Sequence, residues 1–395
     1  MQNIKTDYVP KKRKNYNICI ICATGIDLLR YFHKNIEIAL NFLGHNVKLI
    51  TDKEWIEKFN NKNDILVESK CDFYLSTNSE CYESIVYQQK NTPLLVMCID
   101  RVYHILRNKT NVNNVVHLWV SRRDMNNAYL YIENNEHYFL PHAASIDEDL
   151  DINKLFNKKR VLDVFISCHY IKNFASSIYP KGGYDISSIK RVYHSFFNDM
   201  KSLEECTEAE MNFDKKQLAD FMWDSALFID SKARMNAKLT IINKIIDAGF
   251  SLHCCGANWE KTEIIKNENF IYYGPLTTKV SNKKMEDAKI VVNAMVPSFD
   301  GSHERIFESM LRGALCITTP SDYLRETFKD GENIVFFDPL DLNTLVEKIN
   351  FYLQNEGERL RITKNAFNEV ISKHTWYHRA DELLDIYENY ISLKK

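Results

Sequence analysis

A short charged segment, residues 301–313, carries the strongest chemical signal in the sequence. It opens with Gly301 and Ser302 and places Arg305 three residues later, within a run that mixes charged and apolar side chains. Ser302 is a suitable N-cap, because its hydroxyl accepts a backbone N–H that a helix start leaves unpaired. The free N–H groups and the positive dipole end of such a helix attract phosphate, and Arg305 adds a fork of donors suited to a diphosphate. The segment therefore predicts an anion site at a helix N-terminus.

Two glutamates give the same expected helix a second role. Glu304 and Glu308 are four residues apart, so they project from one helix face. Glu308, one turn deeper, is placed to accept both hydroxyls of a ribose. A surface cluster of ion pairs between Glu304, Arg305 and Glu308 is the competing interpretation. The apolar residues that surround Glu308 indicate partial burial, which favours the binding role.

The hydrophobic pattern predicts a scaffold for these residues. Short apolar runs rich in β-formers alternate with longer amphipathic ones, which is typical of βαβ units around a parallel sheet. The clearest unit has a strand at 17–22, a helix at 28–43 and Gly44 as the cap that accepts a positive φ. Further strands are expected at 47–51, 73–76, 94–99, 115–120, 138–140, 161–167, 251–255, 270–273, 290–293, 315–318 and 334–337. Two doubly wound α/β domains follow, with ligands at the carboxyl ends of the strands, in the cleft between the halves.

The composition limits the classes of protein that fit. A chain of 395 residues is too long for one ordinary core, which also favours two domains. The net charge of −2, from 51 basic and 53 acidic residues, argues against a nucleic-acid partner. Ten cysteines without a regular framework favour free thiols in a reducing compartment, and hence a cytoplasmic location. No stretch reaches the roughly 18 apolar residues that a membrane span needs.

A basic tetrad, Lys11-Lys12-Arg13-Lys14, precedes the first expected strand. Short charge runs of this kind are usually solvated, so we expect a solvated tail. The alternative is weak peripheral contact with anionic lipid, worth about 1 kcal/mol per basic residue near the surface.

Three patterns of potential metal ligands do not predict a metal site. Cys19-x-x-Cys22 lies on an expected strand rather than in a knuckle turn, and no second pair follows at zinc-finger spacing. Asp149-Leu150-Asp151 lies in a polar linker, so we expect it to be exposed to solvent. His374 and His378 have helical spacing but no carboxylate or thiolate partner nearby in the sequence. We therefore expect a bound anion to be neutralised by the basic side chain and helix N-terminus described above.

The segment His303-Glu304-Arg305-Ile306-Phe307-Glu308, followed by Gly313-Ala314-Leu315, resembles the signature of group 1 glycosyltransferases. The resemblance points to the branch that contains the spore-maturation CgeB-like proteins. It is good over about 250–395, thinner before that range and absent from 171–232. The other segments that resemble this family are 139–143, 162–167, 255–259, 328–338 and 374–379.

This resemblance implies the GT-B architecture, in which two Rossmann-like domains face a central cleft. An N-terminal acceptor-binding domain would span 1–150, and a nucleotide-sugar-binding domain would span 151–375. The second domain would carry a helical or irregular insert at 171–232 near its start. A C-terminal helix at 376–395 would pack back toward the N-terminal domain.

The resemblance also implies further donor-binding residues. Arg234 and Lys238 would begin the helix after the insert, one turn apart, near the diphosphate; ordinary solvated helix charges are the alternative. Gly256 follows an expected strand and would let a ligand approach the backbone closely. Asn258 and Trp259 would then bound the base, although Trp259 is equally suited to a core position.

The chain departs from the family pattern at one position. Relatives often carry two glutamates seven residues apart around the helix that follows residue 302. The second matches Glu308, but the first falls on Gly301, so His303 or Glu304 would replace its contact to the sugar. His303 is accordingly also a catalytic candidate.

Inverting relatives place a general base on the loop after the first strand, where this chain has Asp27. A helix N-cap is the structural alternative for Asp27. Asp100, after the strand at 94–99, and His104 form a second candidate pair.

Together these observations predict a metal-independent glycosyltransferase. Its donor would be a nucleotide sugar, UDP- or GDP-linked, with no further cofactor. Its acceptor would be a hydroxyl of a glycan, a lipid-linked sugar or a protein. A nucleotide-sugar-binding module without catalysis is the first alternative, because the first glutamate is missing. A nucleotide-sugar epimerase is the second, although no NAD-binding glycine fingerprint follows the first strand.

Overall fold

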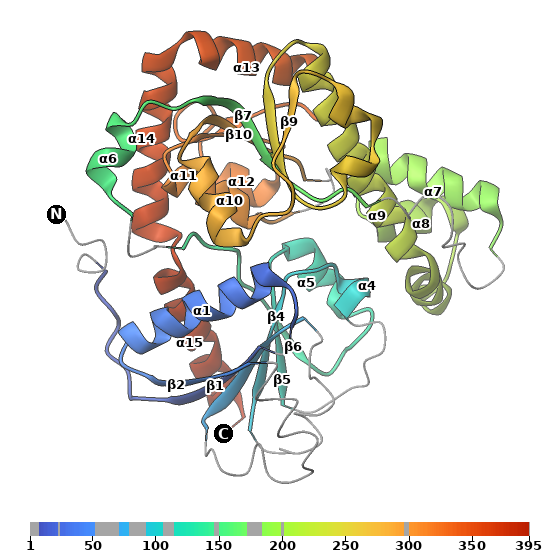
Figure 1. The fold of residues 1–395 in the computed structure, drawn as a ribbon. Coiled ribbons are helices and arrows are strands. Elements are labelled where there is room, and N and C mark those ends of the chain that lie inside the picture. The colour runs from blue at the N-terminus through green and yellow to red at the C-terminus, as the bar shows by residue number, and fades with distance from the viewer. Residues whose placement is uncertain are drawn as a thin grey trace. The chain divides into compact units, whose positions relative to one another are not determined.

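The computed structural model describes residues 8–22, 24–51, 71–78, 92–105, 114–145, 150–171, 184–198, 201–295 and 300–394. These residues form two compact units (Figure 1). Unit 1 lies within 1–146 and 372–395, and unit 2 within 147–371. The chain therefore leaves unit 1, completes unit 2 and returns to unit 1 with its last helix.

Unit 1 contains a six-stranded sheet with the order β2-β1-β3-β4-β5-β6, and all its pairs are parallel. The central strands are buried along their whole length, as expected for a sheet covered on both faces. Its strands are β1 (Asn17–Cys22), β2 (Asn46–Thr51), β3 (Phe73–Thr77), β4 (Leu94–Cys98), β5 (Val115–Trp119) and β6 (Glu136–Phe139). Its helices are α1 (Asp27–Phe42), α4 (Val102–Ile105), α5 (Arg122–Ala128) and α15 (Trp376–Leu393). Each of these strands lies within about two residues of the range that the hydrophobic pattern predicts.

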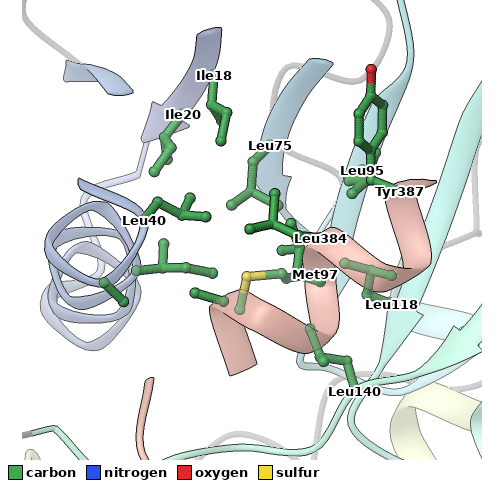
Figure 2. Packing of buried hydrophobic residues seen from close by; sticks show 14 of the residues in the cluster. Ile18, Ile20, Leu40, Leu75, Leu95, Met97, Leu118, Leu140, Leu384 and Tyr387 are labelled. Carbon is green, nitrogen blue, oxygen red and sulfur yellow. The ribbon is translucent and has the colours of Figure 1, made fainter. Parts of the chain in front are cut away.

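The core of unit 1 joins segments from both ends of the chain (Figure 2). Helix α1 contributes a stripe with helical spacing that includes Phe32, Ile36 and Leu40. Helix α15 contributes Leu384 and Tyr387 to the same cluster. Gly44 ends the first helix with a φ of +91°, which confirms its predicted role as a cap.

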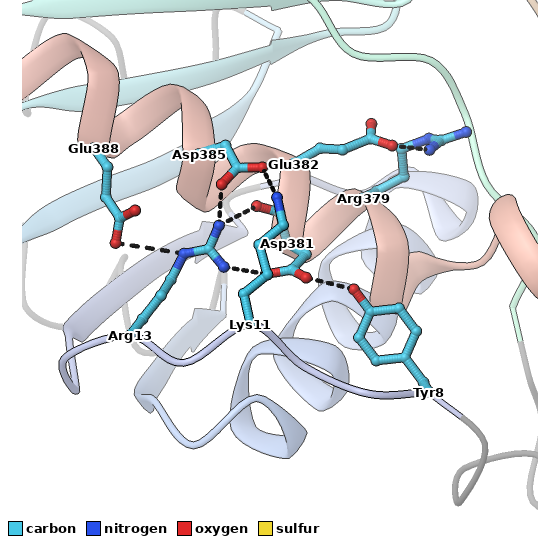
Figure 3. A network of polar contacts seen from close by, with 8 residues as sticks. All are labelled: Tyr8, Lys11, Arg13, Arg379, Asp381, Glu382, Asp385 and Glu388. Atoms are coloured by element: carbon cyan, nitrogen blue, oxygen red, sulfur yellow. Dashed lines mark hydrogen bonds and ion pairs between the residues drawn. The ribbon is translucent and has the colours of Figure 1, made fainter.

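Ion pairs between side chains anchor the N-terminal segment to α15, so this segment is not a solvated tail (Figure 3). Arg13 pairs with Asp381 and Asp385, and its Nε lies 3.4 Å from Glu388. Only 5% of the Arg13 side chain is exposed. Tyr8 donates a hydrogen bond of 2.6 Å to Asp381.

This network corrects the interpretation of the basic tetrad. The prediction of a solvated tail is wrong for Arg13, whose partners lie more than 360 residues away in the sequence. Lys11 also pairs with Asp385, at an exposed position. Two of the four basic residues thus pair with carboxylates of α15, so less positive charge is left to contact an anionic membrane surface. Among the described residues, no helix is long and apolar enough to span a bilayer.

Unit 2 contains a second six-stranded sheet, also parallel throughout, with the order β12-β11-β10-β7-β8-β9. Its strands are β7 (Leu162–Ser167), β8 (Leu252–Cys255), β9 (Phe270–Tyr272), β10 (Ala288–Asn293), β11 (Leu315–Thr318) and β12 (Val335–Phe336). Its α-helices are α6 (Ile152–Asn157), α7 (Ile186–Asn198), α8 (Leu203–Met211), α9 (Lys215–Asp247), α10 (Thr278–Met285), α11 (Glu304–Leu311), α12 (Asp322–Thr327), α13 (Asn343–Gln354) and α14 (Glu356–Lys373), and two short 3-10 helices are η3 (Trp259–Lys261) and η4 (Glu263–Lys266).

The described part of the insert is helical, and its last helix is longer than the sequence analysis predicted. Helix α9 spans 33 residues and begins at a capping box in which Asp214 and Gln217 exchange side-chain and backbone hydrogen bonds. Neither glycine nor proline interrupts it. It packs with α7 and α8 and then continues into the sheet-covering part of unit 2. The expectation that a helix begins near Arg234 is therefore wrong, because Arg234 lies in the middle of α9.

Candidate functional site

The strand order of unit 2 locates the edge of the sheet at which a ligand is expected to bind. The first strand of the unit, β7, is central, and the chain winds outward from it on both sides, through β8 and β9 on one side and through β10 to β12 on the other. Ligands of doubly wound sheets bind outside the carboxyl ends of the strands at this switch point. The residues that follow β7 and β10 are therefore the first candidates.

Helix α11 follows β10, and it starts later than predicted. Its N-cap residue is His303, and no side chain caps it. Ser302 is fully buried one residue earlier. The neighbouring Gly301 carbonyl accepts a hydrogen bond of 2.7 Å from Ser321. The prediction of Ser302 as the N-cap is wrong, because Ser302 precedes the N-cap position and belongs to the packed turn.

Arg305 is held at the carboxyl end of β10. Its Nη1 donates to Asn293 Oδ1 at 3.3 Å, and its Nη2 lies 2.9 Å from His303 Nε2. Glu304 Oε1 lies 3.4 Å from Arg305 Nε, and Glu304 also pairs with His303. Only 8% of the Glu304 side chain and 16% of that of Arg305 are exposed, so a surface ion-pair cluster does not describe them. Asn293 was not singled out from the sequence, although its position as the last residue of an expected strand is a usable signal.

Two further cations approach Arg305 from helix α9. Arg234 Nη2 lies 2.6 Å from Asp230 Oδ2, and Asp230 is fully buried. Lys238 lies one turn further along the helix. The pKa of Lys238 is lowered to about 8, mainly by burial and further by the charges of Arg305 and Arg234. Cys168 and Asp230 act in the opposite direction and raise this pKa. Because both arginines act on Lys238, the three cations gather at one place.

The loop after β7 is braced by the segment that follows β8. Gly256 has a φ of +134°, and a Cβ there would meet the Cys168 carbonyl oxygen at 2.0 Å. Trp259 is fully buried and donates from Nε1 to the same carbonyl at 2.7 Å. Asn258 donates to the Tyr170 carbonyl at 3.1 Å. Gly256 is thus needed for close packing of the chain on itself, and Trp259 is a core residue rather than a wall of the base pocket.

Glu308 is buried deeper in α11 than its partners at the helix start. Its Oε2 lies 3.5 Å from Arg312 Nη2, and 2% of each side chain is exposed. Arg312 Nη1 also lies 3.8 Å from Glu286 Oε1. The burial expected from the surrounding apolar residues is confirmed. Contact of Glu308 with a ribose remains a prediction.

The base candidates of unit 1 lie at the corresponding edge of its sheet. Asp27 is exposed and is the first residue of α1, whose N-cap is Ile26. The alternative of Asp27 as an N-cap is therefore wrong by one position. Asp100 follows β4, is exposed and accepts a hydrogen bond of 2.9 Å from Asn78, which follows β3. The side chain of His104 lies outside the described residues.

The patterns of potential metal ligands lie at structural positions in strands, turns and helix caps. Cys19 and Cys22 are buried within β1, as expected from their strand pattern. Asp151 accepts a hydrogen bond from the backbone of Lys154 at the start of α6, and Asp149 lies outside the described residues. His378 completes the capping box of α15. In the described ranges, no three His, Cys, Asp or Glu side chains form a cluster able to hold a metal ion.

Comparison with known proteins assigns a class to this arrangement. Residues 237–385 match the model of a family described as glycosyl transferase-like. This match includes Lys238, Arg305 and Glu308. The comparison with curated proteins finds no significant match.

Several solved structures share the fold. A sucrose-phosphate synthase from Thermosynechococcus elongatus is 12% identical, with a TM-score of 0.56, covering 96% of this chain and 100% of that one. The Anabaena protein HepE, in complex with UDP and glucose, is 9% identical, with a TM-score of 0.55, covering 95% and 100%. An α-glucosyltransferase in complex with UDP and a 13-mer DNA is 11% identical, with a TM-score of 0.54, covering 95% and 100%.

The two parallel sheets and these similarities confirm the GT-B fold with two Rossmann-like domains. The family match confirms the predicted function class, glycosyl transfer. The protein is therefore a transferase. The match does not single out the CgeB-like branch.

Proposed function

We propose that the protein transfers a sugar from a UDP- or GDP-linked donor to a hydroxyl of a glycan, a lipid-linked sugar or a protein, and that it does so as a member of the CgeB-like branch. The observation that carries the donor assignment is the gathering of Arg234, Lys238 and Arg305 beside the switch point of unit 2. The low pKa of Lys238 means that its surroundings disfavour a further positive charge. A diphosphate would supply the missing negative charge.

In the proposed reaction, the acceptor oxygen bonds to the anomeric carbon as the bond from that carbon to the diphosphate oxygen breaks. The diphosphate leaves with the electron pair. Arg305 and Lys238 stabilise its growing charge, which is usually the largest electrostatic contribution in such a site. In an inverting reaction, Asp27 takes the acceptor proton.

We propose that the diphosphate needs no divalent metal, because these cations and the N-terminus of α11 supply its counter-charge. Glu308 is the proposed ribose ligand, and His303 or Glu304 the proposed sugar contact. Two similar structures, HepE and the α-glucosyltransferase, contain UDP, which supports a uridine nucleotide as the first donor to test.

The proposed acceptor is a carbohydrate or glycoconjugate. The DNA in the α-glucosyltransferase complex raises nucleic acid as an alternative. The net charge of −2 supports the carbohydrate, since a phosphate backbone is bound mainly through excess positive charge.

The test combines binding and turnover. Isothermal titration with UDP and GDP should show binding that Arg305→Gln weakens at least about tenfold, the size expected for a charge-assisted contact. Arg361→Gln is the matched control, since Arg361 is exposed and paired with Glu358 on α14. Release of UDP or GDP from the sugar nucleotides, with and without glycan acceptors, then measures transfer. Binding without any release would identify the module that lacks catalysis, and no binding of either nucleotide would refute the donor site.

A further inference from the structure

His169 lies close enough to Lys238 and Arg305 for the charges of both to act on its ring. It follows β7 at the carboxyl edge of the sheet, next to Cys168. Two backbone hydrogen bonds of 2.9 Å join this loop to the end of β8 and the residues after it. Cys168 N–H donates to the Cys255 carbonyl, and Tyr170 N–H donates to the Ala257 carbonyl. The loop reaches α9 where Ile171 N donates to Met235 Sδ at 3.3 Å. Met235 lies between Arg234 and Lys238 in sequence, so the loop is tied to the helix that carries both cations.

The ring of His169 has a defined hydrogen-bonding direction. The Ala257 backbone N–H donates to His169 Nδ1 at 2.7 Å, so Nδ1 is an acceptor and carries no proton. His169 is exposed to solvent on one side, but partial desolvation lowers its pKa, and the charges of Lys238 and Arg305 lower it further. A neutral imidazole with an accepting Nδ1 carries its proton on Nε2. His169 therefore presents an N–H donor that adds no charge to the cation cluster.

We propose that His169 donates its Nε2–H to an oxygen of the donor diphosphate, as a fourth ligand beside Arg234, Lys238 and Arg305. This assignment rests on the proposed donor site. A neutral donor suits the position, because a fourth positive charge would be repelled by the other three. The bond from Ala257 fixes the ring, so that the donor is oriented before the nucleotide binds.

Two substitutions separate the contact from the structural role of the ring. Asn at position 169 places its amide oxygen near Nδ1 and retains an acceptor for Ala257, but it is too short to supply the distal donor. Gln places an amide nitrogen near Nε2 and retains that donor, but gives up the acceptor for Ala257. His194→Asn is the matched control, because His194 is exposed on α7.

The experiment measures UDP and GDP affinity by titration calorimetry and melting temperature for all four proteins. We expect His169→Asn to weaken binding at least about tenfold with little change in melting temperature, as for a lost hydrogen bond to a charged group. We expect His169→Gln to bind more tightly than His169→Asn, and His194→Asn to match the wild type.

Wild-type affinity in His169→Asn would overturn the assignment while leaving the donor site intact. Equal loss in the Asn and Gln variants would also overturn it, because the distal donor would then make no difference. Failure of the wild type to bind either nucleotide would refute the donor site itself, and the assignment with it.

Discussion

The protonation state of Lys238 makes binding of the donor diphosphate depend on pH. Its pKa is about 8 in the free protein, against a usual value of 10.5. A bound diphosphate favours the ammonium form and raises this pKa. Affinity is then fully present below the pKa of the free protein and is lost as pH rises through it.

The size of the effect follows from the two pKa values. With a pKa of about 8, Lys238 is about one-tenth protonated at pH 9 and about nine-tenths protonated at pH 7. If the complex restores the value of 10.5, binding takes up about 0.9 proton at pH 9 and about 0.1 proton at pH 7. The corresponding affinity for UDP falls about tenfold between pH 7 and pH 9.

Titration calorimetry in pairs of buffers with different ionisation enthalpies measures this uptake directly. Lys238→Met should abolish the rise in proton uptake between pH 7 and pH 9. Cys168→Ala is the control, because the Cys168 thiol lies close to Lys238 and is itself titratable. A hydrogen bond with Cys254 lowers the pKa of this thiol, and the charges of Lys238 and Arg305 lower it too. The reasoning is refuted if wild-type uptake is the same at both pH values, or if the rise persists in Lys238→Met.

Four further outcomes are expected. Glu308→Gln should weaken UDP binding by about 1.5–3 kcal/mol. Glu308→Ala should in addition lower the free energy of unfolding by about 3–5 kcal/mol in denaturant titration, because it leaves Arg312 buried without this partner. Unchanged UDP affinity in the Gln variant would remove Glu308 from the site. EDTA should leave the initial transfer rate unchanged, and loss of activity that Mg²⁺ or Mn²⁺ restores would contradict this. Asp27→Asn should reduce turnover about 10²–10⁴-fold without changing melting temperature or UDP affinity, whereas turnover within about threefold of wild type would make Asp100 the next base to test. Arg13→Met should cost about 3–5 kcal/mol of unfolding free energy and the exposed Lys12→Met almost none, so equal effects would show that the network with α15 contributes little.

The sequence pattern predicted the sheets well because their signal is local. Most of the strands are short apolar runs, and the run at 315–318 coincides with β11. The glycine after α1 was equally readable, because a positive φ at a helix end is a local requirement. The buried position of Glu308 followed from its apolar neighbours in one helix.

What the pattern missed depends on contacts between distant segments. Arg13 finds its acidic partners on α15, and no local feature of the tetrad marks that pairing. Gly256 was interpreted as a place where a ligand approaches the backbone, but the Cys168 carbonyl of the loop after β7 occupies the space beside its Cα. His169 was not identified, because its role depends on the Ala257 N–H, which folding alone brings to the ring.

The discontinuous course of unit 1 has a consequence for the order in which the protein folds during synthesis. Domains usually fold from the N-terminus onward as the chain emerges. Here the core of unit 1 includes residues of α15, such as Leu384 and Tyr387, so it cannot be completed until that helix has been made. All of unit 2 is synthesised before then. Unit 2 can therefore reach its native state on the ribosome first. Until α15 has been made, part of the apolar face of the unit 1 strands stays uncovered.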